Sequence, residues 1–364
     1  MTGTLNRREL LRGIGAAAGV AFAPSTIARL GPPDGMIALR YNENPYGPSA
    51  SALKAAGKAS ELGAYYATET PTMLLEAIAR RNELTLDNMV LSSGSNEALQ
   101  AAFVAWGKTG KIVLPNHTYT DHLAYSERMG VELVTVPLND DLSIDLDGLA
   151  AAVTDDVSVV YVCNPNNPTG MTIDGDTLRD FCRTVGRKAV VIVDEAYNEV
   201  TDDPDYTSMV DLVREGENIV VMRTFSKIFG MAGMRVGYGM ARPDLAQTIE
   251  EHVMAWPNVV GVSAAIASYA DRAFIRFSRE KIMQGRRMVV ETFRRNGIEP
   301  LPSQTNFVYA DIGRNASEFQ EKMAERGILI RGSFPLYPNY SRVSMGRLEE
   351  LEIFDRVFTE VYNA

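Results

Sequence analysis

Segments of strand character and segments of helix character alternate from residue 88 to residue 240, and this alternation constrains the fold more than any other feature. Residues 157–162 and 219–224 read as strands, and residues 190–193 form the continuous apolar run typical of a strand buried on both faces. Alternating strands and helices form βαβ units, whose strands are parallel. The sequence therefore predicts an α/β fold with a mostly parallel central sheet flanked by helices.

The remaining segments predict a second, smaller α+β domain. From about Trp256 the chain begins with a helical stretch and continues to strands near residues 306–310 and 328–330. We expect this part to join residues 31–64 in the smaller domain, with residues 65–255 forming the larger one. A chain of 364 residues that is 46% hydrophobic is long enough to bury a core of this size.

Charge and cysteine content exclude several classes of function. The net charge of −10 provides no basic stripe for the phosphate contacts of a nucleic-acid partner, so none is expected. The two cysteines, Cys163 and Cys182, have neither the number of a disulfide framework nor metal-ligand spacing. We expect both to be core residues and expect no metal site.

Residues 223–237 place one lysine among groups suited to hold a phosphate. A lysine that loses its proton in a confined site can form a Schiff base with the carbonyl of pyridoxal 5'-phosphate, and Lys227 is the candidate. The hydroxyl of Ser226 and the guanidinium of Arg235 are suited to bind the phosphate of that cofactor. A strand followed by a solvated loop would also fit these residues. Three glycines should let the backbone approach closely: Gly230, Gly233 and Gly237.

Two segments upstream supply groups for the cofactor ring. Asp194 follows the apolar run, at the strand end where open α/β sheets bind ligands, and a carboxylate there would keep the pyridine nitrogen protonated. Tyr197 could reach the phenolic oxygen of the ring, and so could Asn167, in the Asn-Pro-Asn-Asn-Pro-Thr-Gly turn at 164–170. The competing interpretations are a helix cap for Asp194 and a plain turn for 164–170.

A third upstream segment, residues 92–97, lies between a short strand and a helix that runs through Trp106. A helix N-terminus with free backbone amides binds anions, so Ser95 and Asn96 would complete the phosphate site. The alternative is an ordinary cap, in which Ser93 or Ser95 satisfies the first helical amides.

From about residue 37 to the C-terminus the chain resembles the aspartate aminotransferase superfamily, fold type I of the pyridoxal phosphate enzymes, and within it the histidinol-phosphate aminotransferases. The resemblance rests on residues 42–48, 164–170, 194–197 and 224–227, with the glycines and arginine that follow them. It implies a homodimer that moves an amino group from a small-molecule amino donor to a 2-oxo acid in amino-acid biosynthesis. Lys227 would carry the cofactor and move the proton, and Asp194 and Tyr197 would assist it.

The same resemblance assigns further residues. Tyr119 occupies the place of the aromatic residue that stacks on the cofactor ring. Tyr66 fits the tyrosine that reaches the phosphate of the neighbouring subunit's cofactor, which implies shared sites. Arg342 would bind the substrate carboxylate. Arg331, Tyr46 and Asn44 would face the substrate, although arginines on edge strands are commonly just solvated. Asn96 stands where the family often has aspartate, and residues 333–340 match no pattern of the family.

The N-terminus resembles a twin-arginine export signal, because Arg7 and Arg8 precede an apolar, glycine- and alanine-rich run at residues 13–23. That run is too short for a permanent membrane anchor, so no stable membrane insertion is expected. The assignment of residues 1–30 as a signal predicts a periplasmic or exported protein; otherwise the protein would be cytoplasmic. A soluble amphipathic helix would show polar positions at helical spacing, which the run lacks.

Three alternatives remain beside the aminotransferase. A decarboxylase of the same fold, similar to threonine-phosphate decarboxylase, would differ in which substrate bond stands perpendicular to the ring, and sequence does not show that orientation. An exported serine hydrolase of the penicillin-binding type would use Ser51 and Lys54, but its Ser-Asp-Asn element is missing. A non-catalytic binding protein would not need the full set of Lys227, Asp194, Tyr197 and Arg235.

Overall fold

The computed structural model describes residues 31–66 and 68–364, so the predicted export signal at residues 1–30 lies outside the described residues. Residues 37–364 form one compact unit. Among the described helices, none has both the length and the apolar character that crossing a membrane requires.

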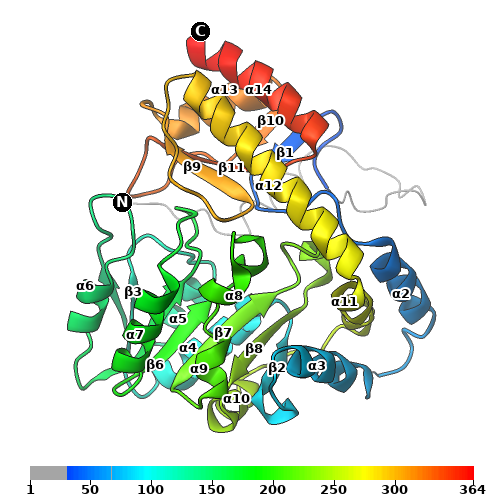
Figure 1. The fold of residues 1–364 in the computed structure, drawn as a ribbon, viewed down its shortest axis with the longest axis vertical. Helices are drawn as coiled ribbons and strands as arrows, with labels where there is room; N and C mark the ends of the chain where they lie inside the picture. The colour runs from blue at the N-terminus through cyan, green and yellow to red at the C-terminus, as the bar shows by residue number, and fades with distance from the viewer. Residues whose placement is uncertain (1–30, 67) are drawn as a thin grey trace, which may run out of the picture. The chain divides into compact units, whose positions relative to one another are not determined.

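A seven-stranded sheet runs through the larger part of this unit (Figure 1). Its strands, in spatial order, are β2 (Met89–Ser92), β8 (Gly237–Ala241), β7 (Ile219–Thr224), β6 (Val190–Asp194), β5 (Val157–Cys163), β3 (Lys111–Pro115) and β4 (Leu133–Val136). β8 is antiparallel to both of its neighbours, and the pairs from β7 to β4 are parallel. The prediction of an α/β fold with a mostly parallel sheet is confirmed.

Successive side chains of β6 enter two separate hydrophobic clusters. Val191 and Val193 belong to one cluster, while Val190 and Ile192 belong to the other. Because side chains of a strand alternate between the faces of its sheet, both faces of β6 are covered. This explains why residues 190–193 are apolar without interruption.

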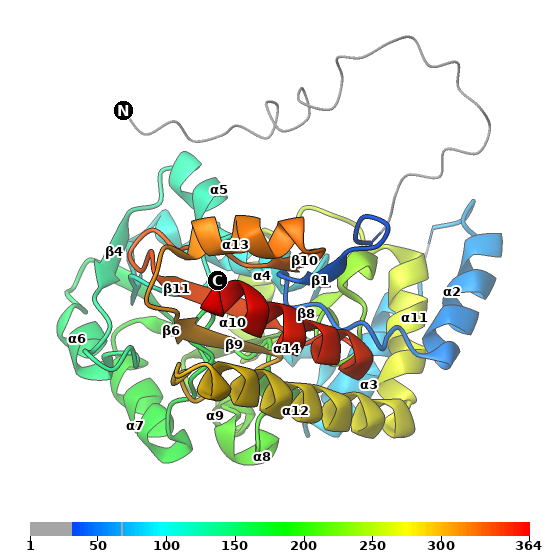
Figure 2. The same cartoon turned by 90° about the horizontal axis from the view of Figure 1, so that it is seen from above.

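Helices cover the two faces (Figures 1 and 2). α4 (Ser95–Gly107) packs on the sheet with a nearly continuous set of buried residues and also contacts α10 (Pro243–Glu250). α7 (Gly175–Val185) begins at Asp174, whose side chain accepts a hydrogen bond from the Thr177 amide, and buries one apolar face. The other helices of this region are α5 (Leu123–Arg128), α6 (Leu146–Ala151), α8 (Pro204–Thr207) and α9 (Val210–Arg214), with the 3₁₀ turns η1 (Leu86–Asn88), η2 (Asn198–Val200) and η3 (Ala232–Met234).

Three further helices pack together near the antiparallel edge of this sheet. α11 (Val259–Ala270) contacts both α2 (Ala50–Glu61) and α3 (Thr70–Arg81). The sequence assigned α2 and α11 to the smaller domain and α3 to the larger one. That division, at residues 64/65 and 255/256, stays a prediction.

The C-terminal part contains two short sheets and three helices. β1 (Ile37–Leu39) pairs in parallel with β10 (Ile328–Ile330), and β9 (Phe307–Asp311) pairs antiparallel with β11 (Tyr340–Ser344). An isolated bridge between Arg331 and Arg342 joins the two arginine-bearing segments. The long helix α12 (Arg272–Arg295) contacts β9 and α14 (Leu348–Asn363), and α13 (Ala316–Glu325) contacts β10.

Candidate active site

A cavity of about 660 Å³ opens at the carboxyl ends of β5, β6 and β7. Ligands of open α/β sheets bind at this edge. Most of the residues selected from the sequence line the cavity: Ser95, Asn96, Tyr119, Asn167, Asp194, Tyr197, Ser226, Lys227, Arg235, Arg331 and Arg342. These residues come from segments as far apart as α4 and β11, so the fold brings together what the sequence separates.

Lys227 extends from the loop after β7 into this cavity. Its Nζ donates a hydrogen bond to the carbonyl oxygen of Asn42 at 3.2 Å and lies 5.4 Å from the centre of the Tyr197 ring. Burial, followed by the positive charge of Arg342, lowers the pKa of Lys227 from its usual 10.5 to about 8, against the opposing charges of Glu43 and Asp194. The amine is therefore neutral far more often than a surface lysine, as a nucleophile must be.

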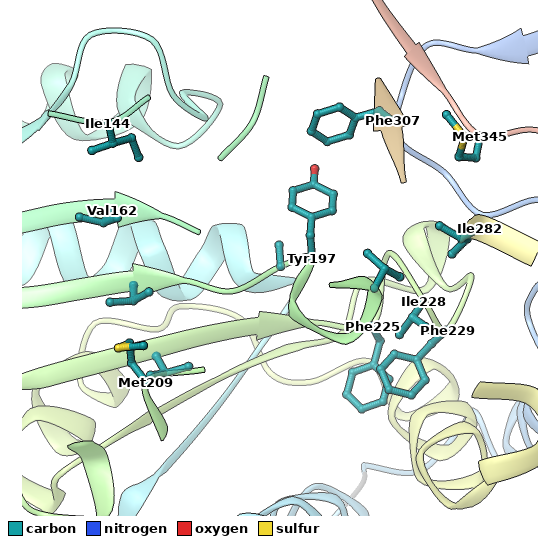
Figure 3. Close-up of a cluster of buried hydrophobic side chains, with 14 of the residues drawn as sticks. Ile144, Val162, Tyr197, Met209, Phe225, Ile228, Phe229, Ile282, Phe307 and Met345 are labelled. Carbon is teal, nitrogen blue, oxygen red and sulfur yellow. The ribbon is translucent and has the colours of Figure 1, made fainter. Parts of the chain in front are cut away.

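A chain of hydrogen bonds connects the groups around Lys227. The hydroxyl oxygen of Tyr197 accepts from the Asn42 amide at 3.1 Å and from the Asn167 amide at 3.4 Å. Asn167 in turn accepts from the Arg342 guanidinium at 2.6 Å. The Tyr197 ring packs edge-on against Phe307, with ring centres 5.3 Å apart (Figure 3). Each of these groups is thus held in place before any ligand binds.

Asp194 ends β6, as the sequence predicted, and is 1% exposed. Its carboxylate accepts hydrogen bonds from the Tyr161 hydroxyl at 3.1 Å and the Ala196 amide at 3.1 Å. Burial raises its pKa to about 6 even against these two hydrogen bonds. This carboxylate has no ion-pair partner within 4.0 Å among the described residues, although the charge of Lys227 acts on it, and a protonated ring nitrogen would supply such a partner.

The N-terminus of α4 is open toward the cavity. Its N-cap residue is Gly94, and no side chain caps the first helical amides, so the alternative of a serine cap is wrong. Nearby, Thr224 donates to the Ser226 hydroxyl oxygen at 2.8 Å, which leaves the Ser226 proton free for another acceptor. Arg235 donates to the carbonyl oxygens of Ala232 and Ser93 and so faces the same end of the helix. Free amides, a hydroxyl and a guanidinium together make an anion site.

Close backbone approach explains two of the three glycines singled out earlier. A Cβ at Gly237 would overlap the backbone nitrogen of Ser95, and one at Gly230 would overlap the backbone of Gly47. The expectation was wrong for Gly233, because a Cβ there would meet only open space.

Three selected residues do not line the cavity. Asn44 is buried and donates to the Ile228 carbonyl and the Ser278 hydroxyl. The hydroxyl of Tyr46 accepts from the Leu348 amide. Tyr66 is 87% exposed on this chain. The structure thus places the first two in the scaffold that supports the neighbouring residues 42 and 43.

Two functional candidates escaped the sequence analysis. Tyr161 is fully buried in β5 and holds Asp194, but in the sequence it is one apolar position among several. His122 is also fully buried, and neither ring nitrogen has a hydrogen-bond partner among the described residues. Its ring centre lies 5.1 Å from that of Tyr161 and 5.6 Å from that of Tyr119. Burial lowers the pKa of His122 to about 3, so the ring is neutral and supports the two tyrosines by packing.

The loop between β10 and β11 supplies a wall that the sequence could not place. Phe334, Pro335 and Leu336 line the cavity. The guanidinium carbons of Arg331 and Arg342 lie 5.4 Å and 5.8 Å from the centre of the Phe334 ring. A guanidinium is attracted to an aromatic face at such distances, so Phe334 helps to orient both arginines.

Comparison with known proteins shows the family. The family model described as "Aminotransferase class I and II" matches residues 34–356. The chain belongs to the class I and II aminotransferases. It is 34% identical over 317 residues to a histidinol-phosphate aminotransferase of Akkermansia muciniphila (86% of each chain) and 32% identical over 330 residues to one of Moorella thermoacetica (90% of this chain, 85% of that one).

Solved structures agree with this membership. The histidinol-phosphate aminotransferase of Sinorhizobium meliloti, crystallised in complex with pyridoxal-5'-phosphate, is 29% identical, with a TM-score of 0.80 over 90% of each chain. The protein is a fold type I aminotransferase that uses pyridoxal 5'-phosphate, as the sequence predicted.

The residues present fit this cofactor. The open N-terminus of α4, with Ser226 and Arg235, would hold its phosphate; buried Asp194 would hold its ring nitrogen; and Tyr119 would face its ring. Tyr119 is oriented by a hydrogen bond from its hydroxyl to the Asn96 side chain at 2.8 Å. When bound, the cofactor supplies an aldehyde for the amino group and a ring that accepts electrons from the substrate.

The residues around the cofactor site can perform the steps of transamination that protein side chains carry out. The Nζ of Lys227, with its lowered pKa, can accept a proton from a substrate carbon and return it elsewhere. Tyr197 and Asn167 can donate hydrogen bonds to an oxygen placed between them, because the network from Asn42 to Arg342 fixes their orientation.

Proposed function

We propose that this aminotransferase takes as its donor an amino compound of the histidinol-phosphate type and passes the amino group to a 2-oxo acid. The observation that supports this most is the agreement of the curated relatives, which are histidinol-phosphate aminotransferases at 32–34% identity over 86–90% of the chain. The decarboxylase and hydrolase alternatives are not favoured. Ser51 donates to Asp271 and does not line the cavity.

The cavity contains two guanidinium groups beyond the predicted phosphate site of the cofactor. Arg342 is 8% exposed, and its Nε has no hydrogen-bond partner among the described residues. Arg331 is exposed and lines the same cavity. An anionic donor and the carboxylate of a 2-oxo acid both need such a group, and arginine binds either with two parallel hydrogen bonds.

The decisive experiment is a donor screen with the holoenzyme, followed through the visible absorbance of the bound cofactor. Histidinol phosphate should convert the absorbance, and 2-oxoglutarate should restore it, without release of carbon dioxide. The substitution Arg331→Gln should raise KM for histidinol phosphate about tenfold, whereas Arg326→Gln, an exposed arginine outside the cavity, should leave it unchanged. Turnover of other amino donors with none of histidinol phosphate would refute the proposed substrate.

The assembly that we propose is a homodimer with shared sites. An exposed aromatic patch supports it: Tyr66 lies against Trp256, with ring centres 5.9 Å apart, and the two residues are 87% and 77% exposed. Large exposed aromatic side chains of this kind mark interaction surfaces. Sedimentation should show a dimer, and Trp256→Glu should shift it toward monomer and weaken cofactor binding. A monomeric, fully active wild-type protein would refute the proposal.

We also propose export through the twin-arginine signal read at residues 1–30, which lie outside the described residues. Fractionation of cells should recover the protein in the periplasm. Replacement of Arg7 and Arg8 by lysine should retain it in the cytoplasm. Unchanged periplasmic delivery of that variant would count against the signal.

A further inference from the structure

A second cavity, of about 680 Å³, is as large as the active-site cavity and shares no lining residue with it in the part of the chain that the structure describes. It is lined by the end of α3, by η2 and the residues up to α9, by β7 and β8, and by the beginning of α12. In Figure 1, α3, α8 and α11 lie around the same region of β7 and β8. Cavities of this size commonly hold small molecules.

Arginine is prominent in the lining, and three of these arginines have carboxylate partners. Arg179 Nε lies 2.6 Å from an oxygen of Asp211. Arg223 makes two hydrogen bonds to Glu195, the shorter of them 2.7 Å. Glu195 is fully buried, so this second pair belongs to the scaffold beneath the cavity. Arg214 Nε lies 3.9 Å from an oxygen of Glu83, so these three arginines have counter-charges without a ligand.

Three other arginines of the lining have no carboxylate within 4.0 Å among the described residues. Arg81 and Arg279 donate to backbone carbonyl oxygens, and the Nε of Arg279 is buried without a partner among the described residues. Arg272, the first residue of α12, has no hydrogen bond or ion pair in the described part of the chain. Arg279 follows Arg272 by seven residues, so both lie on one face of α12, roughly 10 Å apart along its axis.

Arg81 and Arg272 line the same cavity, and their positive charges repel each other. Partial burial lowers the pKa of Arg81, and the neighbouring charge of Arg272 lowers it further. The guanidinium of Arg81 stacks on the Tyr269 ring, 3.5 Å from its centre, and one of its terminal nitrogens donates to the Tyr269 carbonyl oxygen, which together fix its orientation. An anion between the two guanidinium groups would relieve this repulsion and accept hydrogen bonds from them.

Four carboxylates also line the cavity, and they oppose a purely anionic ligand: Glu199, Asp202, Asp205 and Asp211. Asp202 and Asp211 have arginine partners, whereas Glu199 and Asp205 have none among the described residues. Glu199, in η2, has no ion-pair partner within 4.0 Å among the described residues, and its charge interacts with Arg223 and Arg81. A carboxylate beside a phosphate site can accept a hydrogen bond from a hydroxyl group on the same ligand. The cavity therefore offers cationic donors at one side and an acceptor at another.

We propose that this second cavity binds the phosphate monoester of a hydroxylated small molecule. The phosphate lies between Arg81 and Arg272, and the organic part extends toward Glu199. The cavity is far larger than one phosphate, which leaves room for that organic part.

The test is calorimetric titration of the holoenzyme, in which the cofactor already fills the anion site at α4. The two probes are inorganic phosphate and sn-glycerol 3-phosphate, each at pH 8. Both should bind at one site per chain, the ester more tightly. Arg81→Gln and Arg272→Gln should each weaken binding about tenfold or more. The matched control is Arg276→Gln, because Arg276 is exposed on α12 between the two but does not line the cavity.

Glu199→Gln should change the affinity for phosphate in the opposite direction. A folding defect would weaken binding, so it cannot imitate this result. Removing the negative charge of Glu199 should tighten the binding of inorganic phosphate by roughly two- to fivefold. Three results would overturn the proposal: no binding of either probe at 10 mM, equal losses in Arg276→Gln and Arg81→Gln, or loss of binding in Arg331→Gln, which would place the anion in the active site. Tighter binding of phosphate than of the ester would contradict the assignment of a monoester.

Discussion

The protonation of Lys227 can be tested without any substrate. In the protein without cofactor, burial and the charge of Arg342 together lower the pKa of Lys227 from 10.5 to about 8. At pH 7 an amine of pKa 8 is neutral in about 10% of molecules, and one of pKa 10.5 in about 0.03%. Lys227 should therefore react with an acylating reagent about 300-fold more often than its ordinary pKa would allow, apart from effects of access.

The perturbation that separates the causes of this shift is Arg342→Gln. After burial, the positive charge of Arg342 is the largest cause of the lowered pKa of Lys227. Removing that charge favours the protonated amine, so the pKa of Lys227 should rise, and acylation at pH 7 should slow. Arg326→Gln removes an exposed charge paired with Glu360 and should change nothing.

The assay is competitive acetylation with a trace of acetic anhydride between pH 6 and pH 11, with Lys227 quantified by mass spectrometry against a lysine peptide added to the same reaction. The wild-type midpoint should lie near pH 8 and move upward in Arg342→Gln. A wild-type midpoint near 10.5 would refute the view that burial prepares this amine. An unmoved midpoint in Arg342→Gln would refute the part assigned to charge.

Three further predictions follow from other contacts. Glu195→Gln leaves Arg223 buried without its ion-pair partner and should lower the free energy of unfolding by about 3–5 kcal/mol, measured by urea denaturation; a loss below 1 kcal/mol would contradict the buried pair. Gly237→Ala should destabilise by about 1–3 kcal/mol and weaken cofactor binding, whereas Gly233→Ala, with open space around it, should do neither in thermal melts and cofactor titration. Tyr161→Phe removes a hydrogen bond to ionised Asp194, so the pKa of that carboxyl should rise above about 6 and the cofactor Kd should increase about tenfold; an unchanged Kd on titration by absorbance would count against this role.

Much of the larger sheet could be predicted because its central strands are buried on both faces. Residues 157–163 and 190–194 are almost entirely apolar, as expected of strands buried on both faces, and both are strands in the structure. β8 carries no such signal. Its sequence Gly-Tyr-Gly-Met-Ala has low strand propensity, and its place between β2 and β7 depends on close approach to α4 at Gly237. The three-residue β1 pairs with a strand about 290 residues later, which local pattern cannot reveal.

Some residues of the candidate active site could likewise be predicted from the sequence, and others could not. Residues whose chemistry is unusual for their place in the chain, such as Lys227 and Arg235, were found from sequence and line the cavity. Asn44 and Tyr46 lie in an equally distinctive motif, but their polar atoms are used to hold the scaffold. Tyr161 was missed because a tyrosine within an apolar strand looks like core, and only the pairing of β5 with β6 brings its hydroxyl to Asp194.

The anion site at α4 has a consequence for how the chain matures. Arg235 reaches the Ser93 carbonyl across 142 positions of sequence, because β8 inserts between β2 and β7. A nascent chain therefore cannot bind the phosphate of the cofactor until Arg235 has been translated and has reached Ser93. Closing a loop of this length is slow, because the two residues are far apart in the sequence. Cofactor binding should accordingly be a late step of folding. When the vitamin is scarce, chains without cofactor should accumulate, and in these chains β8 should be the first strand to unfold locally.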